Sequence, residues 1–519
     1  MGPARTAACD VRLIDRSQPW YKLGVRAAPR RPLGLDLAVV ALGTAVILLV
    51  TYAAVAPEIG LGALLVVAVY VAAVAGFLRA PHLAVAATVV LFALIPSLKV
   101  FVGDWVGALK DLVVVGAVSA GIVLCVSEPR LPDRWILIPV WLLLGLYVVN
   151  LGGGHGVAWA QGVRLIGEPL VLLLVGLMLP QPRRTFRWAL GALVAAACFA
   201  AAYGLLQHAV GKWTLVDDWG YSFTKQVRTI PHHLRSFGTF DDPFAYATFL
   251  LFGIGVLMFW LRRGALVWAA GGLMLAGLVF SYVRTAAVVL AAFVGLLLIR
   301  RGHVSVRALA IAATALVAVV VAGALVFGGA QGTQTIVRRV TTSQGTRFET
   351  VRFSNVVLNG RLSAWEAALG HDPREWIFGR GVGKVGTAAE RAAYTVEPSN
   401  GAGVDPAIRQ AACLRGQLKS CPADSGYLAT VADVGGVGLV VLLALFARLF
   451  VLSARAAVRG SDAGWVALAF LAALLLDALT RASFTGFPTA FLGLLVIGIA
   501  LASARVEGES EPPTTSSAT

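Results

Sequence analysis

The sequence predicts an all-α protein that crosses a membrane about fourteen times, and three observations support this fold class. Of the 519 residues, 58% are hydrophobic and 13% are charged, whereas a soluble domain carries about 25% charged residues. The mean hydropathy is +0.81. Apolar runs of about 17–25 residues, the length that spans a bilayer as a helix, recur from residue 33 to residue 504. No cleavable signal peptide is expected, because a long basic segment precedes a first apolar run that is too long.

The apolar runs fall into three groups of transmembrane helices, 33–206, 243–328 and 425–504. The helices that we expect in them are 33–56, 59–78, 82–98, 109–127, 134–152, 163–180, 186–206, 243–261, 265–281, 284–300, 307–328, 425–447, 463–480 and 486–504. A basic tail, 1–32, precedes the first group. The last segment, 505–519, ends in "EGESEPPTTSSAT", a polar composition that predicts a disordered cytoplasmic tail.

Lys and Arg alternate along the chain as the positive-inside rule requires of cytoplasmic loops. With the N-terminus inside, every cytoplasmic connection carries at least one of them: the 1–32 tail, Arg79, Arg130, Arg134, Arg183, Arg184, Arg187, Arg262, Arg263, Arg300, Arg301, Arg307, Arg448, Arg455, Arg459 and Arg505. Both termini are therefore expected in the cytoplasm. The net charge of +16 is explained by this orientation signal, and we expect no nucleic-acid partner.

Two outer loops, 207–242 and 329–424, are too long to be simple connections, because loops above about 15 residues are usually functional or disordered. In the larger loop, Leu362, Trp365 and Leu369 give the start of one segment the apolar face of a helix on a membrane surface. The mixed composition of 355–395 predicts that this part of the loop is ordered.

Cysteine placement agrees with an outer position for the large loop. Cys413 and Cys421 lie together in "CLRGQLKSC", and outside the membrane they are expected to form a disulfide. A zinc site needs more ligands than this pair has nearby.

The Gly-rich segment 378–386, "FGRGVGKVG", has two readings. The first is a turn at which backbone segments pass closely. The second is a phosphate-binding nest of backbone N–H groups, flanked by Arg380 and Lys384. A nucleotide site is not expected, because no strand of a βαβ unit precedes the glycines.

Charged residues inside the apolar segments fall into pairs that neutralise themselves. Arg164 and Glu168 are four residues apart, as are Asp477 and Arg481, and this spacing places each pair on one helix face. Structural pairing is the leading interpretation of both. A further group at an outer corner is either a solvated face or the wall of a polar cavity: Lys99, Asp104, Lys110 and Asp111.

Arg284 interrupts about three dozen apolar residues in "FSYVRTAAVV", and it has no acidic residue within four positions. A charge at the bilayer centre costs at least about 2.5–3.5 kcal/mol. The alternation of loops places Arg284 instead at the outer surface between two antiparallel helices. There it either reaches generic lipid phosphates or binds a specific anion.

Four stretches, in this order along the chain, resemble the superfamily of O-antigen ligases and O-antigen polymerases. They are "RSFGTFDDPFAYATFLL" (235–251), "FSYVRTAAVVLAAFVGLL" (280–297), "GRLSAWEAALGHDPREWIFGRGVG" (360–383) and "ADSGYLATVADVGGVGL" (423–439). The resemblance covers about 235–440, and the first 200 residues match in hydropathy only.

This resemblance implies a glycosyltransferase of the cytoplasmic (inner) membrane that works without a metal or cofactor. Its donor would be a polyprenyl-diphosphate-linked glycan, and its acceptor a glycan or a lipid. Asp424 stands where the ligases carry a histidine, which favours a polymerase or another transferase. The residues implied are Asp424 and Arg284 as catalytic groups, with Arg235, Arg361, Arg380 and Lys384 as substrate-binding groups. Arginines suit this role because they are always charged and bind phosphates with two donors.

We therefore expect an enzyme that transfers or polymerises lipid-linked glycans on the outer face of the membrane, in cell-surface polysaccharide assembly. Two alternatives remain open at this stage. One is a ligase that moves the glycan to a different acceptor. The other is a transporter or flippase, although such proteins usually show repeated halves and broken helices near the midplane, and no repeat is evident in the sequence.

Overall fold

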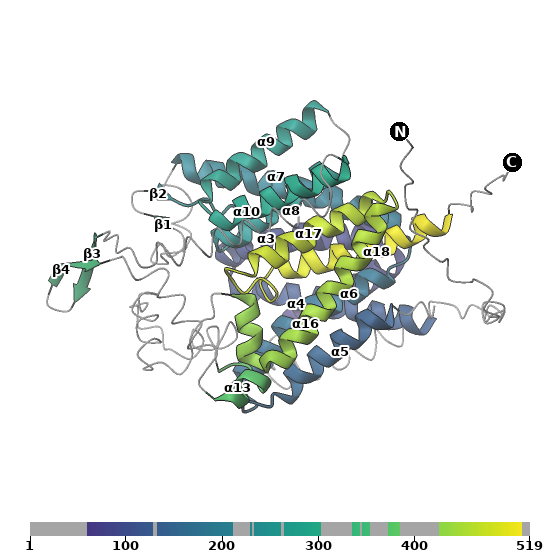
Figure 1. The fold of residues 1–519 in the computed structure, drawn as a ribbon, viewed down its shortest axis with the longest axis horizontal. Helices are drawn as coiled ribbons and strands as arrows, with labels where there is room; N and C mark the ends of the chain where they lie inside the picture. Colours follow the sequence, from purple (N-terminus) through teal and green to yellow (C-terminus); the bar gives the residue numbers. More distant parts are fainter. Residues whose placement is uncertain are drawn as a thin grey trace, which may run out of the picture.

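The structure, a computed structural model, describes residues 60–127, 132–210, 229–230, 233–260, 264–302, 335–342, 345–352, 372–384 and 425–510. These residues form a bundle of long helices that run side by side (Figure 1). The helices are α2 (Gly60–Arg79), α3 (Pro81–Val102), α4 (Gly107–Ser127), α5 (Arg134–Val149), α6 (Val157–Met178), α7 (Pro182–Val210), α8 (Pro243–Phe259), α9 (Ala265–Phe280), α10 (Arg284–Arg300), α13 (Pro373–Phe378), α16 (Gly426–Val458), α17 (Asp462–Asp477) and α18 (Thr489–Ser510), with a 3₁₀ turn, η2 (Asp104–Val106).

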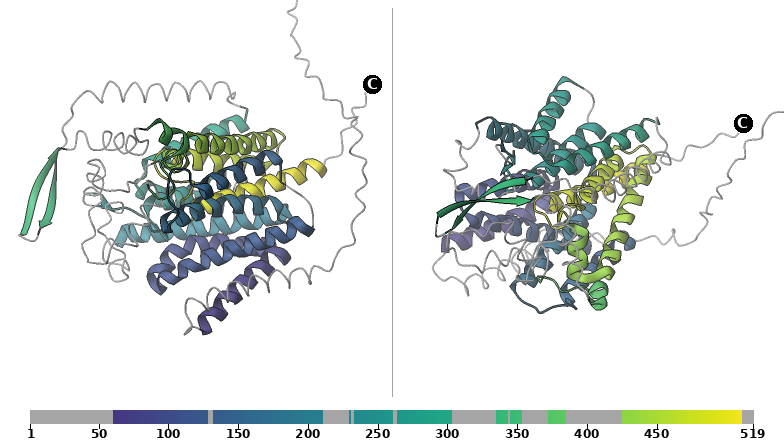
Figure 2. Two further views of the ribbon diagram at one scale, coloured as in Figure 1. Left: turned by 90° about the horizontal axis from the view of Figure 1, so that it is seen from below. Right: turned by 60° about the vertical axis from the view of Figure 1, so that its left-hand side comes forward.

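Two small antiparallel strand pairs lie outside the bundle (Figures 1 and 2). β1 (Thr229–Ile230) pairs with β2 (His233–Leu234). β3 (Thr335–Thr342) pairs with β4 (Gly345–Arg352), in a register that sets Thr342 opposite Gly345.

Twelve of the fourteen predicted helical segments fall within the described residues, and each contains a helix. The segments 33–56 and 307–328 lie outside these residues. The predicted number of membrane spans is not matched, because only six described helices are long and apolar enough to cross a membrane. Others end early: an αL residue, Asn150, terminates α5 after 16 residues, a length of roughly 24 Å against a hydrocarbon core of about 30 Å.

Two predicted boundaries are also wrong. α7 continues to Val210, into the segment that was expected to be the first outer loop, and α18 continues to Ser510, into the expected disordered tail. The last turns of α18 have a tertiary anchor, since the Ser461 hydroxyl donates to Glu507 Oε2 over 2.6 Å. The composition of 505–519 could not predict this contact, because its partner Ser461 lies 46 residues away in the chain.

α18 lies at the centre of the bundle, where it packs against α6, α7 and α17. Its apolar stretch Thr489–Glu507 is 83% buried. α6 and α18 cross closely because each has a glycine at the crossing. A Cβ at Gly176 would lie 2.6 Å from the Leu495 carbonyl oxygen, and a Cβ at Gly498 would lie 2.4 Å from the Leu173 carbonyl oxygen.

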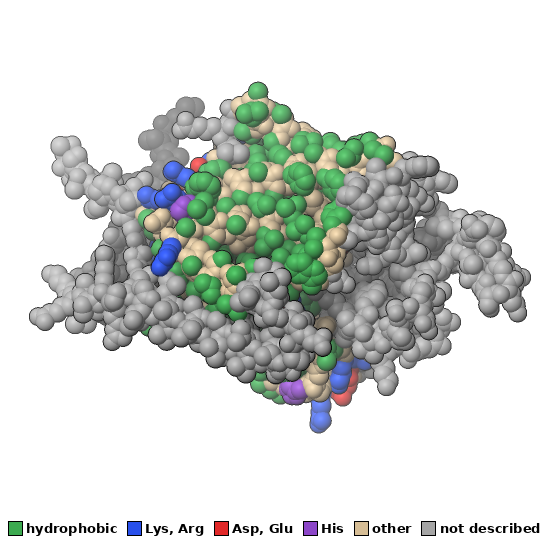
Figure 3. Space-filling model, turned by 180° about the vertical axis from the view of Figure 1, so that it is seen from behind, with side chains coloured by type: hydrophobic (Ala, Val, Ile, Leu, Met, Phe, Trp, Pro, Cys, Tyr) green, Lys and Arg blue, Asp and Glu red, His purple; other side chains and the backbone are tan. Residues whose placement is uncertain are grey.

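The outside of the bundle is apolar over a broad face (Figure 3). Leu266, Val440 and Trp141, on three different helices, are exposed by 86%, 67% and 63%, and large exposed apolar surfaces mark sites that contact a partner or a membrane. Together with the apolar helices, this surface fits an all-α, multi-pass membrane protein.

One end of the bundle, termed the arginine end, carries a series of basic residues where helices begin or finish. They include Arg79, Arg134, Arg183, Arg184, Arg187, Arg300, Arg301, Arg448, Arg455, Arg459 and Arg505. Ion pairs tie these helix ends together: Arg448 to Asp133, which also caps α5, and Arg300 to Asp462. Burial of Asp133 raises its pKa, but the ion pair with Arg448, the Trp135 N–H and the charge of Arg134 together lower it more, so the pKa lies below its ordinary value.

The opposite end, termed the loop end, holds α13, the turn 281–283 and the loop 478–488 (Figure 1). α16 bends near this end, because Gly435 has φ 74° and ψ −175° inside the helix. α13 packs at the bend, and a Cβ on Gly435 would lie 2.1 Å from the Ile377 carbonyl oxygen. Only glycine fits this combination of backbone conformation and close approach.

Candidate functional site at the loop end

Arg235 and Arg284 meet at the turn between α9 and α10. Arg235 closes the turn from outside: its Nε donates to the Ser281 carbonyl over 3.0 Å and its Nη2 to the Tyr282 carbonyl over 3.1 Å. Its guanidinium also lies over the Phe244 ring, 5.1 Å from the centroid. The turn itself has a strained residue, Tyr282, with φ 53°.

Arg284 is the first residue of α10 and is exposed. Within the described residues it makes no ion pair or hydrogen bond. Its position is unfavourable for a cation, because the N-terminus of a helix carries partial positive charge. The backbone N–H groups there favour a bound anion.

The two positively charged guanidinium groups repel one another. Burial lowers the pKa of Arg235, and the positive charge of Arg284 lowers it further, while Asp242 opposes both effects. Arg284 has no counter-charge within the described residues, and an anion bound beside it would neutralise its charge. The structure therefore places Arg235 and Arg284, two of the predicted site residues, at the same turn.

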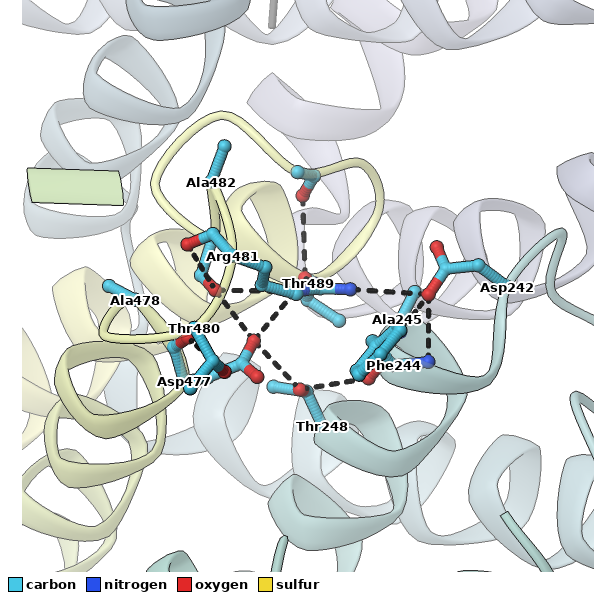
Figure 4. Close-up of polar contacts among 12 residues, drawn as sticks. Asp242, Phe244, Ala245, Thr248, Asp477, Ala478, Thr480, Arg481, Ala482 and Thr489 are labelled. Carbon is cyan, nitrogen blue, oxygen red and sulfur yellow. Dashed lines mark hydrogen bonds and ion pairs between the residues drawn. The ribbon is translucent and has the colours of Figure 1, made fainter. Parts of the chain in front are cut away.

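Arg481 organises a second polar cluster, which joins α8, α17 and the loop 478–488 (Figure 4). Its Nε lies 2.7 Å from Asp477 Oδ2 and its Nη1 lies 3.4 Å from Asp242 Oδ1. Asp477 Oδ2 also accepts from Thr248 over 3.0 Å and from Ser483 over 2.6 Å. The predicted pairing of Asp477 with Arg481 is confirmed, and its extension to Asp242 could not be seen from spacing.

Burial lowers the pKa of Arg481, but the carboxylates of Asp477 and Asp242 raise it more, so the pKa lies above its ordinary value. This cluster is internally neutralised to a large extent. Its role is to fix the loop 478–488 against α8, and Asp242 serves twice, because it also caps α8 through the N–H groups of Phe244 and Ala245.

The predicted pair Arg164 and Glu168 is confirmed, with Nε 2.9 Å from Oε1. The same carboxylate accepts from Lys110 Nζ over 2.6 Å, and Asp111 pairs with both Lys110 and Arg164. The Lys110 side chain is 8% exposed and lies over the Phe491 ring. Lys110 thus belongs to a charge-balanced network that reaches from the buried Glu168 to the partly exposed Arg164 and Asp111.

The Gly-rich loop is a close crossing of backbones, as the first of its two readings proposed. A Cβ at Gly379 would lie 2.6 Å from the Asp433 carbonyl oxygen, one at Gly381 would lie 2.6 Å from Gly153 N, and all three glycines, Gly379, Gly381 and Gly383, have positive φ. Any larger residue would push this loop away from α16 and from the end of α5.

The two basic residues of this loop, Arg380 and Lys384, make contacts within the protein that hold the loop in place. Lys384 Nζ donates to the Gly152 carbonyl over 2.6 Å, and Arg380 Nε lies 3.5 Å from Glu375 Oε2. The Arg380 N–H donates to the Ala432 carbonyl, one of the carbonyls near the bend of α16, over 2.7 Å. These contacts do not form the phosphate nest that was considered for this segment.

Sequence reasoning missed a buried acid, Asp433, on the inner side of the α16 bend. It is 7% exposed, and the Tyr147 hydroxyl donates to its Oδ2 over 3.4 Å. The signal was present in the sequence, since an acid in an apolar segment without a base at helical spacing marks a functional candidate. Its partner lies 286 residues away.

Four predicted residues, Asp424, Arg361, Cys413 and Cys421, lie outside the described residues. Ser425, a possible helix cap, does occupy the N-cap position of α16, but its hydroxyl donates to the Ala478 carbonyl over 3.1 Å. In the part of the chain that the structure describes, no three His, Cys, Asp or Glu side chains converge as metal ligands. No protein-family model and no curated protein matches this sequence.

Proposed function

We propose that this protein transfers or polymerises glycans carried on a polyprenyl diphosphate, at the outer face of the cytoplasmic membrane. The observation that supports this most is the pair Arg235 and Arg284 at the loop end, with Arg284 unpaired within the described residues. Two adjacent guanidinium groups match the two phosphates of a diphosphate, since each can donate two hydrogen bonds to phosphate oxygens. The resemblance in sequence to O-antigen ligases and polymerases points to the same donor.

The orientation in the membrane follows from the distribution of charge. The arginine end faces the cytoplasm by the positive-inside rule, which places both termini there and the loop end outside. The Arg235–Arg284 pair then lies at the level of lipid headgroups, where the diphosphate of a lipid-linked donor is held by its own anchor.

The proposed reaction breaks the bond between the anomeric carbon and a diphosphate oxygen, so negative charge grows on the leaving diphosphate. Fixed guanidinium groups at that oxygen lower the barrier, because they stabilise charge that develops in the transition state. Asp424 takes the proton of the attacking acceptor hydroxyl. Arg361 remains a candidate donor to the diphosphate, whereas Arg380 and Lys384 support the loop that packs on α16.

Lipid-linked glycans from a strain that lacks this protein test the proposal. A polymerase predicts that single lipid-linked repeat units accumulate, and a ligase predicts that longer lipid-linked chains accumulate. The wild-type protein should restore the normal profile, while Arg284→Ala and Asp424→Asn should not. Arg455→Ala, at the arginine end, is the control that should restore it.

An unchanged profile of lipid-linked glycans in the deletion strain would contradict the proposal. Repeat units confined to the cytoplasmic leaflet would point to a flippase instead, because the defect would then precede the outer face.

A further inference from the structure

A small cavity lies between the start of α16, the end of α5, α6 and the loop 478–488. Its walls include Tyr147, Leu165, Thr430, Asp433, Ala482 and Phe484. The cavity has a volume of about 10 Å³, close to the ~10–15 Å³ that one water requires. The cavity therefore admits one water or one hydroxyl group, but not a whole sugar ring.

Asp433 gives this cavity an unsatisfied hydrogen-bond acceptor. Its Oδ1 is buried and accepts no hydrogen bond within the described residues, while Oδ2 faces Tyr147 and the Gly383 N–H approaches the carboxylate. No Lys or Arg of the described residues forms an ion pair with it. A buried acceptor left without a donor is destabilising, so a donor in the cavity would be favoured.

Three backbone features hold the backbone of Asp433 in place. The bend at Gly435 follows it by two residues, the Gly379 backbone packs directly on its carbonyl, and the Arg380 N–H binds the preceding carbonyl of Ala432. A side chain supported in this way cannot easily turn to find another partner. Such preorganisation is what a binding group needs.

The size of the cavity and the residues that line it indicate which kind of ligand it can bind. A phosphate, with four oxygens, is too large for a cavity that holds one water, and a divalent cation needs about six or more oxygens. The hydroxyls of Thr430 and Thr485 donate to backbone carbonyls, and the remaining wall is largely apolar, with Leu165, Ala482 and Phe484. An uncharged hydrogen-bond donor of the size of one hydroxyl group fits best.

We propose that the Asp433 cavity is a hydroxyl-binding subsite, in which one hydroxyl group of a glycan donates to Asp433 Oδ1. The identity of the ligand as a glycan rests on the proposed function, whereas the presence of a hydroxyl-binding site rests on the cavity and its acceptor. A water occupies the same position when no glycan is bound. The subsite contributes to glycan binding at a position separate from the arginine pair, because neither Arg235 nor Arg284 lines this cavity.

Binding of radiolabelled lipid-linked repeat units, extracted from a strain lacking the protein, to the full-length protein in nanodiscs tests this subsite. Asp433→Leu removes both acceptor oxygens at similar size and should raise the Kd about threefold to tenfold, the loss expected for one hydrogen bond. Ala482→Val leaves Asp433 intact but fills the cavity, and it should raise the Kd to a similar extent. Asp462→Asn at the arginine end is the matched control and should leave the Kd within about twofold of wild type.

Transfer is measured on the same samples, so that the two proposals fail separately. If wild type binds the repeat unit but transfers nothing, the proposed reaction is wrong and the subsite stands. If folded Asp433→Leu and Ala482→Val both bind as tightly as wild type, the subsite is wrong. A wild-type protein that does not bind lipid-linked repeat units would overturn both.

Discussion

Replacement of Arg481 by glutamine should destabilise the protein by about 3 kcal/mol, the lower end of the ~3–5 kcal/mol measured when one partner of a buried pair is removed. The change leaves Asp477, whose side chain is 4% exposed, and Asp242, which is 34% exposed, without their shared cation. The value lies at the lower end because Thr248 and Ser483 continue to donate to Asp477.

Thermal unfolding in nanodiscs measures this loss, and the midpoint should fall by roughly 3 °C. Arg455→Gln is the matched control, since Arg455 is exposed at the arginine end, and it should leave the midpoint within about 1 °C. The double change of Asp477→Asn with Arg481→Gln should recover part of the loss, because it removes the uncompensated charge. A single Arg481→Gln variant as stable as wild type would refute the view that this cluster fixes the loop 478–488.

Three further predictions concern orientation, the disulfide and pH. A reporter fused after residue 390 should report the outer side and one fused after residue 304 the cytoplasm; the reverse result would remove the basis for the proposed mechanism. Cys413 and Cys421 should resist maleimide until they are reduced, and labelling of the untreated protein would show free thiols. Since the pKa of Asp133 is held below its ordinary value of 3.8, its contribution to stability is present above that pH and is lost as the pH falls through the lowered pKa. Thermal midpoints measured from about pH 6 to pH 3 should therefore drop less in Asp133→Asn than in wild type, and equal drops would count against the ion pair.

The helices could be predicted from the sequence because hydrophobicity over a window of about twenty residues is a local signal. The ion pairs Arg164 with Glu168 and Asp477 with Arg481 were predicted from their spacing of four residues, which places both partners on one face of a helix. Arg164 and Glu168 do lie on α6, whereas α17 ends at Asp477 and Arg481 reaches it from the loop that follows. Among the described residues, fewer helices than predicted are long and apolar enough to span a membrane, because composition does not reveal where a cap shortens a helix, as Asn150 does.

The tertiary partners of the charged residues could not be predicted from the sequence. Lys110 binds Glu168 across 58 positions, and Arg481 binds Asp242 across 239. These pairings depend on which helices are neighbours, and a single sequence holds no information about that arrangement. Asp433 is the clearest example, because its cavity is formed by four segments that are distant in the chain.

The Gly-rich segment shows how structure decides between two physically reasonable readings. Glycines with positive φ suit both a tight crossing and an anion nest. The distances at Gly379 and Gly381 identify a crossing, and Lys384 is bound to a backbone carbonyl. The sequence favoured the close turn but left the anion nest open.

The most direct test of the central claim is glycan transfer by purified protein in proteoliposomes, with lipid-linked repeat units as donor, comparing wild type with Arg284→Lys. Lysine keeps the charge at the start of α10 but lacks the two-donor fork of arginine. If Arg284 binds the diphosphate as the leaving group, Arg284→Lys should lower the rate at least about tenfold, with normal expression and stability. A rate equal to that of wild type would show that any cation at the membrane surface serves here, and it would contradict the assignment of the Arg235–Arg284 pair as the diphosphate site.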